Sequence, residues 1–500
     1  MGVNVGQILY QGARRHPERE ALVCLESGAR FSYAALDRRA RQAAAALAAA
    51  GVGPRDRVSL CAGNSPDYVA AWFGALYLGA ACAPAPAMSA PPELAHRLDD
   101  AGATLSLCDD ETLARCEAGA ALATRTVPVR RLASLFEAPP PPLSRPVDTA
   151  ADQPALLLYT SGTTGRAKGA TLTHASLQLH TAALCQHSLD LGPSDRVLAA
   201  LPLTHSFGLR MTLLCPFFVG ATVFLRRRFV AARCLEDLEG QAITWTAGVP
   251  TMFARYGALP PGPAPRALRW CLSAGAPLPD ATAEAASQRL GAPLRQGYGM
   301  TEATFSTLDG PPAPATRGSV GRPVWGIELQ ITGPDGAPLP AGAVGEIWLR
   351  GHNVMAGYFG DEASSQAALE GGWMCSGDLG RLDSEGRLWV VDRLKDTILR
   401  GGFNVYPAEV EAALARHPEV ALAVVIGLPH PELGEEVVAV VQRRPGSALR
   451  PEALIEWARG QLSGASRPRR VHLVEALPLG PSGKLSRRAV RAQLLGGDDS

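Results

Sequence analysis

The sequence has little net charge and no paired cysteines. Its 500 residues carry 48 Lys and Arg against 47 Asp and Glu, a net charge of +1. A balance this close to neutrality gives no electrostatic reason to expect a nucleic acid or an anionic membrane as partner. The ten cysteines are scattered without a C-x-x-C pair, which argues against a zinc site and favours reduced thiols in a cytoplasmic protein.

Long apolar segments are missing as well. The first twenty residues, MGVNVGQILYQGARRHPERE, have no apolar core before their charges, so we expect no signal peptide. No apolar run reaches the length of a membrane span. Position 6 is Gly6 rather than Ser or Thr, so Gly2 lacks the myristoylation pattern. With 47% hydrophobic residues, the chain can bury a large core but is too long for one ordinary domain.

Short apolar runs alternate with helical patterns over most of the chain, which predicts a doubly wound α/β architecture. The strands that we expect are residues 57–61, 79–86, 196–201, 221–225, 242–249 and 269–273. From about residue 318 to 390, short β runs and tight turns predict a β-rich subdomain. A charged stretch follows, and we place a boundary at Asp392–Lys395, giving a large N-terminal domain, 1–392, and a small mobile α+β domain, 393–500.

The most informative stretch is LLLYTSGTTGRAKG, residues 156–169. Its first four residues predict a buried strand, and a helical pattern resumes at Ala170. Between them lie small or hydroxylic residues and a lysine: Thr160, Ser161, Gly162, Thr163, Thr164, Gly165 and Lys168. Glycines let backbone N–H groups approach phosphate oxygens, hydroxyls donate hydrogen bonds and the lysine adds a positive charge. The spacing does not fit a Walker A loop, and an ordinary surface loop has the same composition.

Taken with four later motifs, this stretch resembles the nucleotide loop of the acyl-adenylate-forming superfamily, which includes acyl-CoA synthetases, peptide-synthetase adenylation domains and luciferases. The other motifs are LPLTHSFG, QGYGMTE, the block from SGDLG to GGFNVYPAEVE, and LGPSGKLSRR, in the family's order. Ala167 stands where a proline is common. The resemblance implies ATP, Mg²⁺ and either CoA or a carrier-protein phosphopantetheine as reactants and cofactors.

For the N-terminal domain, the resemblance implies roles that composition alone does not. Thr301 would bond a phosphate or acyl oxygen and Glu302 would ligate Mg²⁺, although a solvated glutamate in a turn is the simpler interpretation. Adenine would lie against Ala274, Gly275, Ala276, Gly297, Tyr298 and Gly299. The acyl pocket would be lined by His205, Phe207, Gly248, Gly297, Gly299 and Met300. A lone histidine such as His205 is more often a packed core residue, and no carboxylate is spaced to make it a general base.

In the second half of the chain, the resemblance assigns Asp378 to the ribose hydroxyls and Arg393 to the ribose or the α-phosphate. Lys395 takes the hinge position, and Gly401 and Gly402 would approach the pantetheine thiol. Lys484 would reach the carboxylate and α-phosphate oxygens during adenylation, where an ammonium can neutralise developing charge. Without the resemblance, Asp378 is a turn aspartate and Lys484 one more surface lysine.

The expected reaction is ATP-dependent activation of a small carboxylic acid through an acyl-adenylate, then thioester formation with CoA. Loading of a separate acyl carrier protein or an amine, and a non-catalytic ATP-binding protein, remain alternatives. No acid occurs in Ser206–Leu209, which disfavours an α-amino acid substrate. Arg210 and Arg226–Arg228 are candidates to hold a second carboxylate, but we expect them at the surface. The protein is expected to be a monomer or a homodimer.

Overall fold

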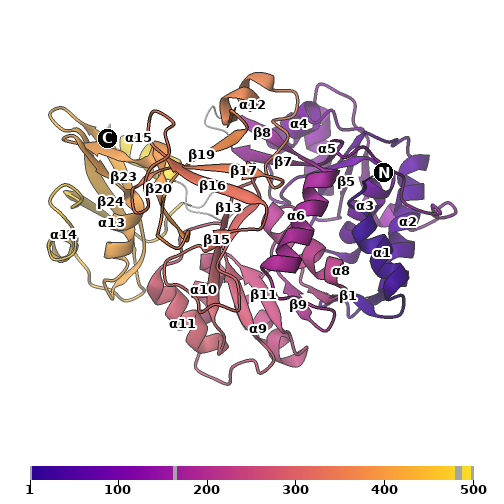
Figure 1. Cartoon of the computed structure of the whole chain (residues 1–500), viewed down its shortest axis with the longest axis horizontal. Coiled ribbons are helices and arrows are strands. Elements are labelled where there is room, and N and C mark those ends of the chain that lie inside the picture. Colours follow the sequence, from indigo (N-terminus) through magenta and orange to yellow (C-terminus); the bar gives the residue numbers. More distant parts are fainter. Residues whose placement is uncertain (1–2, 162–165, 479–486, 497–500) are drawn as a thin grey trace. The chain divides into compact units, whose positions relative to one another are not determined.

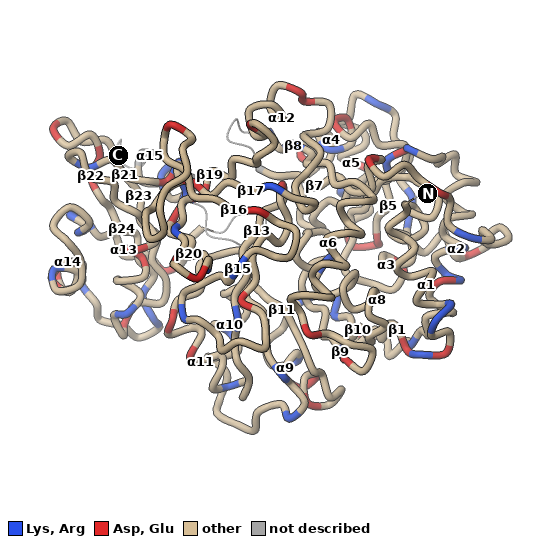
Figure 2. The backbone as a smooth tube through the Cα atoms, viewed as in Figure 1, with Lys and Arg blue, Asp and Glu red and all other residues tan. Residues whose placement is uncertain are grey.

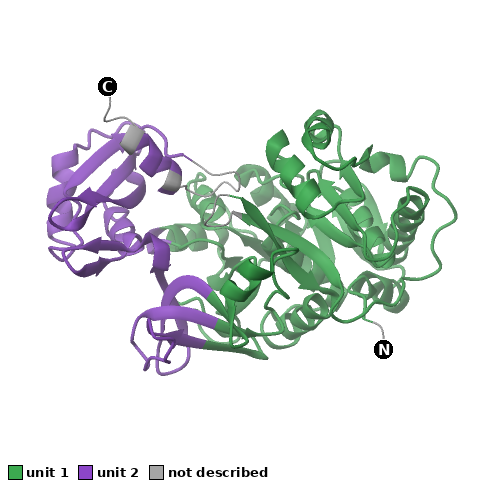
Figure 3. Cartoon of the chain, turned by 90° about the horizontal axis from the view of Figure 1, so that it is seen from above, with its two compact units in different colours: residues 1–278, 282–329, 349–375 green, residues 279–281, 330–348, 376–500 purple. Residues whose placement is uncertain are grey.

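The computed structural model describes residues 3–161, 166–478 and 487–496, which fall into two compact units (Figures 1 and 3). One unit comprises residues 1–278, 282–329 and 349–375, and the other comprises 279–281, 330–348 and 376–500. Among the described residues, no helix combines the length and hydropathy that a bilayer crossing needs. All ten cysteines are free thiols. Basic and acidic residues are interspersed along the backbone (Figure 2).

The larger unit contains two mostly parallel sheets, as the alternating pattern predicts. The six-stranded sheet has the order β6-β5-β3-β4-β7-β8. Its strands are β3 (Arg57–Cys61), β4 (Ala81–Pro84), β5 (Leu105–Cys108), β6 (Val129–Arg131), β7 (Pro154–Ser161) and β8 (Ala167–Thr173). Its helical segments are α3 (Pro66–Tyr77), α4 (Pro91–Asp100), α5 (Leu113–Leu122) and η1 (Leu132–Leu135). Only β8 runs antiparallel to its neighbour.

The nine-stranded sheet has the order β15-β14-β13-β12-β11-β9-β10-β1-β2. Its strands are β1 (Glu20–Cys24), β2 (Arg30–Ser32), β9 (Arg196–Ala199), β10 (Thr222–Leu225), β11 (Trp245–Gly248), β12 (Trp270–Ser273), β13 (Leu294–Gly299), β14 (Phe305–Leu308) and β15 (Arg322–Pro323). The six from β13 to β1 are parallel. Such strands bury both faces, which explains their unbroken apolar runs.

Two helices of this part begin at serine N-caps. The Ser32 hydroxyl accepts a hydrogen bond from the Ala35 N–H at the start of α2. Ser65 caps α3 in the same way, with proline at the first helical position. The remaining helices are α1 (Gln7–Arg15), α2 (Tyr33–Ala49), α6 (His174–His187), α7 (Ser206–Leu209), α8 (Cys215–Val219), α9 (Ala231–Gly240), α10 (Pro250–Gly257), α11 (Asp280–Leu290) and α12 (Glu362–Ala368). A π-helical segment, η2 (Arg210–Leu214), joins α7 to α8.

The β-rich region forms a five-stranded sheet of order β16-β17-β19-β18, with β20 paired to β19. Its strands are β16 (Ile327–Thr332), β17 (Gly345–Gly351), β18 (Leu369–Glu370), β19 (Trp373–Leu382) and β20 (Leu388–Arg393). Between β19 and β20, the Asp383 N–H donates to the Arg387 carbonyl, closing the expected turn. This sheet confirms the change of pattern after residue 318.

The C-terminal part has an apolar core of its own, centred on Val410, Leu414, Val425 and Val441. Its sheet has the order β22-β21-β24-β23, with β25 paired to β24. The elements are η3 (Leu394–Asp396), β21 (Ile398–Arg400), β22 (Phe403–Val405), α13 (Pro407–Leu414), β23 (Val420–His430), β24 (Gly434–Arg443), α14 (Pro451–Arg459), β25 (Arg470–Val474) and α15 (Arg487–Gly496). These match the α+β pattern predicted from the sequence.

Candidate active site

Most of the predicted N-terminal site residues follow the carboxyl ends of neighbouring parallel strands. Strands β9, β11, β12 and β13 pair in that spatial order, β9 with β11, β11 with β12 and β12 with β13. Gly248 ends β11, residues 274–276 follow β12, and residues 300–302 follow β13. Parallel strands present their carboxyl ends at one edge of a sheet, where α/β proteins bind ligands. The sheet order, rather than the sequence order, therefore brings these segments together.

The predicted nucleotide loop connects two antiparallel strands. Thr160 in β7 pairs with Lys168 in β8, and Ser161 pairs with Ala167. Gly162, Thr163, Thr164 and Gly165 lie outside the described residues. The prediction that a helix begins at Ala170 was wrong, because β8 continues to Thr173. The Thr173 side chain then accepts from the Ser176 N–H and caps α6, which begins at His174.

Tyr358 links two of the predicted site residues. Its hydroxyl donates to Oε1 of Glu302 at 3.0 Å, and Lys168 Nζ lies 5.5 Å from the centre of its ring. Burial, with the Glu302 charge as second cause, raises the pKa of the Tyr358 phenol, so the phenol remains a hydrogen-bond donor. Sequence reasoning missed Tyr358, which is 56 residues from Glu302 along the chain.

Lys168 is also held by the start of α12. Its Nζ lies 3.6 Å from Oδ2 of Asp361 and donates a hydrogen bond to the Ser364 hydroxyl. Asp361 in turn caps α12 by accepting from the Ser364 N–H. The ammonium predicted to meet phosphate is therefore anchored by a carboxylate that keeps it oriented.

Glycine is required in β13 because the backbone of β14 lies very close. A Cβ at Gly299 would lie 1.8 Å from the Thr304 carbonyl oxygen, and one at Gly297 would lie 2.7 Å from Phe305 Cε1. Between them, Tyr298 is 8% exposed. These contacts give the QGYG motif a packing role in addition to any contact with adenine or acyl group.

His205 and Phe207 stand at the start of the helical run that leads into η2. His205 occupies the N-cap position of α7, and the Phe207 ring packs on the Phe305 ring at 5.1 Å between centroids. One turn later, Arg210 is only 2% exposed, so its expected surface position was wrong. Apolar residues surround it in the sequence, which was a signal for burial. Arg226 and Arg227 form ion pairs with carboxylates, and Arg228 is exposed.

The predicted residues of the C-terminal half lie in the second unit. Asp378 in β19 is 8% exposed and faces Arg393 in β20, with 3.4 Å between Oδ1 and Nε. Lys395 is exposed in the single turn η3. Gly401 and Gly402 form the β21–β22 turn with φ of 58° and 82°, values that favour glycine. Lys484 lies outside the described residues.

Glu302 suits a magnesium ion that is shared with phosphate. The carboxylate is 8% exposed, and only Oε1 has a partner in the described part of the chain. The same part holds no group of three or more His, Cys, Asp or Glu residues arranged as a metal site. Magnesium is commonly held by one or two carboxylates together with substrate phosphates and waters, so a single free carboxylate oxygen fits that mode.

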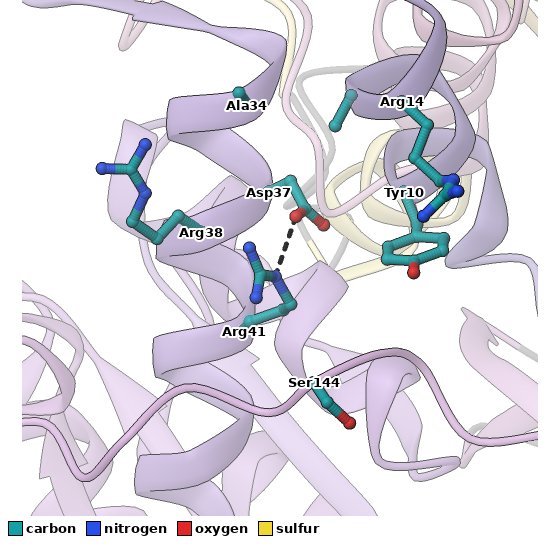
Figure 4. Close-up of a pocket in the computed structure, with 8 residues that line it drawn as sticks. Tyr10, Arg14, Ala34, Asp37, Arg38, Arg41 and Ser144 are labelled. Atoms are coloured by element: carbon teal, nitrogen blue, oxygen red, sulfur yellow. Dashed lines mark hydrogen bonds and ion pairs between the residues drawn. The ribbon is translucent and has the colours of Figure 1, made fainter. Parts of the chain in front are cut away.

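A cavity of about 320 Å³ lies apart from these residues, between α1 and α2 (Figure 4). Its lining consists of Tyr10, Ala13, Arg14, Ala34, Asp37, Arg38, Arg41 and Ser144. The Asp37 carboxylate is satisfied internally, since it accepts from Arg41 Nε and from the Tyr77 hydroxyl, each at 2.8 Å. None of the predicted site residues lines this cavity.

Comparison with known proteins matches two family profiles to the chain. Residues 9–359 match "AMP-binding enzyme", and residues 409–484 match "AMP-binding enzyme C-terminal domain". A feruloyl-CoA synthase of Amycolatopsis sp is 38% identical over 96% of both chains, and a sulfoacetate–CoA ligase of Cupriavidus necator is 35% identical over 95% of both. The crystal structure of ATP-bound MatB from Rhodopseudomonas palustris has a TM-score of 0.92 at 29% identity, covering 99% of both chains.

Proposed function

The chain belongs to the family of AMP-binding enzymes, and we propose that it activates a small carboxylic acid with ATP and Mg²⁺ and transfers the acyl group to CoA. It is an AMP-forming acid–thiol ligase of the acyl-CoA synthetase type. The carboxylate attacks the α-phosphorus and pyrophosphate leaves; the thiol sulfur then attacks the acyl-adenylate carbonyl and AMP leaves. The acids in the names of the two relatives, feruloyl-CoA synthase and sulfoacetate–CoA ligase, differ too much in chemistry to name the acid of this chain.

The observation that carries this proposal is the chain of contacts from Lys168 through Tyr358 to Glu302. One phenol contacts both a cation, near its ring, and a carboxylate, at its hydroxyl, next to the predicted nucleotide loop. Both reactants are anions, so the protein must supply positioning and charge neutralisation rather than covalent chemistry. Lys168 offers a positive charge to the phosphates, and Glu302 Oε2, which has no partner among the described residues, would hold a magnesium ion that neutralises their oxygens.

For the second step, we propose that the part from residue 393 onward moves as a domain relative to residues 1–392. Lys395 lies in a single exposed turn, the kind of segment that absorbs the φ/ψ changes of a hinge. Lys484 would act in adenylation and withdraw before thioester formation, when Gly401 and Gly402 would approach the pantetheine. Asp378 and Arg393 would hold the ribose and the α-phosphate in both steps.

The test is acid-dependent release of pyrophosphate across a panel of carboxylic acids, followed by product analysis with CoA and with a separate acyl carrier protein. We expect release only with acid and Mg²⁺ present, and thioester formation with CoA. Transfer to the carrier protein alone would correct the acceptor. Absence of acid-dependent release would favour a non-catalytic ATP-binding protein.

Ten free thiols support a reducing, cytoplasmic location. Size measurement in solution will distinguish a monomer from a homodimer.

A further inference from the structure

Arg210 is a buried cation to which no carboxylate of the described residues is paired. Its Nη1 donates to the Leu177 carbonyl at 3.1 Å and to the Thr181 hydroxyl at 3.2 Å, both in α6. Its Nε is buried and has no hydrogen-bond partner among the residues that the structure describes. Burial lowers the pKa of Arg210 to about 10, so the guanidinium stays charged near neutrality. Within residues 3–161, 166–478 and 487–496, it forms no ion pair with a carboxylate. A buried charge of this kind is strongly unfavourable unless something compensates it.

The neighbouring groups do not supply that negative charge. His180 is fully buried; the Phe305 backbone lies beside its ring, but neither ring nitrogen forms a hydrogen bond of good geometry within the described part of the chain. Burial, and then the charge of Arg210, hold the pKa of His180 well below its usual value, so the ring is neutral. Burial also raises the pKa of the Cys185 thiol near Arg210, which keeps that thiol protonated. The cluster therefore has several unused hydrogen-bonding atoms and one uncompensated positive charge.

The cluster adjoins the predicted acyl pocket. Phe207, one turn before Arg210, packs on the ring of Phe305. The backbone of Phe305 lies beside His180, whose ring centroid is 5.3 Å from that of His352. Phe207, Phe305, His180 and Arg210 thus form a continuous set of neighbours within one unit. Arg210 is therefore one helical turn from Phe207, a residue of the predicted acyl pocket.

From this arrangement we propose that the acid substrate carries a second anionic group, a carboxylate or sulfonate, which binds Arg210 with His180 beside it. This inference rests on the proposed function, since it names the class of acid that the same site activates. Two anionic groups at opposite ends of one acid would be fixed separately: the reacting carboxylate at the ATP site and the distal group at Arg210. Guanidinium groups suit both carboxylates and sulfonates because their N–H donors form a planar fork.

The test compares acids of matched skeleton in ATP–pyrophosphate exchange: hexanoate with adipate, benzoate with isophthalate, and propionate with 3-sulfopropionate. The wild-type enzyme should prefer the dianionic member of at least one pair. Arg210→Met should lower kcat/KM for that member by about 10²-fold, the scale for removing one partner of a buried charge pair, and change the matched monoacid by less than about threefold. Arg210→Lys should recover part of the loss.

Arg57→Met is the matched control, because within the described residues the Arg57 guanidinium also forms no ion pair with a carboxylate and donates to the carbonyls of Arg55, Ala101 and Gly102. It should lower thermal stability without changing the preference between paired acids. If the wild-type enzyme used the monoacid of every pair as fast as the dianionic acid or faster, the inference would be overturned while acid activation remained intact. This comparison does not need Arg210→Met, so it holds even if that variant fails to fold. An unchanged ratio in a folded Arg210→Met would overturn it as well. No exchange with any acid would overturn the proposed function, and this inference with it.

Discussion

Replacing Tyr358 by phenylalanine should weaken the enzyme's use of Mg²⁺-ATP without removing any predicted site residue. The change deletes only the hydroxyl that donates to Glu302 at 3.0 Å, and a phenyl ring can keep the contact with Lys168. A hydrogen bond to a charged group contributes about 1.5–3 kcal/mol. Since Tyr358 is only half-buried, we take the lower end, about 1.5 kcal/mol, which corresponds to a loss of about tenfold in kcat/KM for ATP.

The loss of kcat/KM should depend on the Mg²⁺ concentration, because the Tyr358 hydroxyl orients the Glu302 carboxylate and does not contact ATP. The Mg²⁺ concentration that gives half-maximal pyrophosphate release should rise in Tyr358→Phe, and excess Mg²⁺ should restore part of the rate. Steady-state kinetics with Mg²⁺ and ATP varied independently would measure both effects. Glu302→Gln should be more severe and should not respond to added Mg²⁺.

Tyr77→Phe is the matched control for this experiment. Its hydroxyl also donates to a carboxylate, Oδ1 of Asp37 at 2.8 Å, beside the separate cavity of Figure 4. This variant should lose stability while its kcat/KM for ATP and its Mg²⁺ dependence stay unchanged. Equal kinetic losses in both variants would show a general effect of weakened packing, and an unchanged Tyr358→Phe would refute the positioning role.

Three further changes test other parts of the molecule. Lys484→Ala should slow adenylation by about 10²–10³-fold and spare thioester formation from supplied acyl-adenylate; rapid-quench assays that find equal losses would contradict domain alternation. Asp378→Asn should raise the KM for ATP about tenfold, measured at saturating acid, and an unaltered KM would remove the ribose assignment. Burial lowers the pKa of His174 to about 4 in the folded protein, whereas the exposed side chain of the unfolded chain keeps a pKa near 6.5. As the pH drops below about 6.5, the unfolded chain therefore binds a proton at His174 before the folded protein does. Stability should then decrease toward pH 4 by up to about 3 kcal/mol, and the acid-induced fall in Tm should be smaller in His174→Gln.

The positions of the strands could be predicted from the sequence, but the order of the strands within each sheet could not. Short apolar runs such as residues 221–225 and 269–273 are strands because only buried parallel strands are apolar on both faces. The spatial order β13-β12-β11-β9-β10-β1 depends on contacts between segments up to hundreds of residues apart, for which no local pattern exists. The late start of α6 had a local signal that was missed, because β-branched Thr171 and Thr173 favour a strand and Thr173 is a good N-cap.

Some site residues can likewise be predicted from sequence motifs, whereas others are brought to the site only by the fold. Lys168 and Glu302 each belong to a recognisable motif, yet their link through Tyr358 exists only because β8 and the segment after β17 meet. Here the Thr171 N–H donates to the Gly357 carbonyl, and the Phe359 N–H donates to that of Gly169. With a third, from the Ala356 N–H to the Thr171 carbonyl, these backbone hydrogen bonds fix Tyr358 beside Lys168 and Glu302. A spacing rule cannot find such a residue.

Arg210 concerns the recognition of the acid rather than of ATP. Residues that handle ATP must suit every acid that a ligase of this kind activates, so selectivity has to come from positions between the motifs. Arg210 follows LPLTHSFG directly and is the single charged residue in the run from Leu209 to Phe218. A cation buried there costs folding energy in the free enzyme, and an anionic substrate recovers that energy on binding. The same cost makes the position a discriminator, because a monoacid that fills the pocket leaves the charge uncompensated.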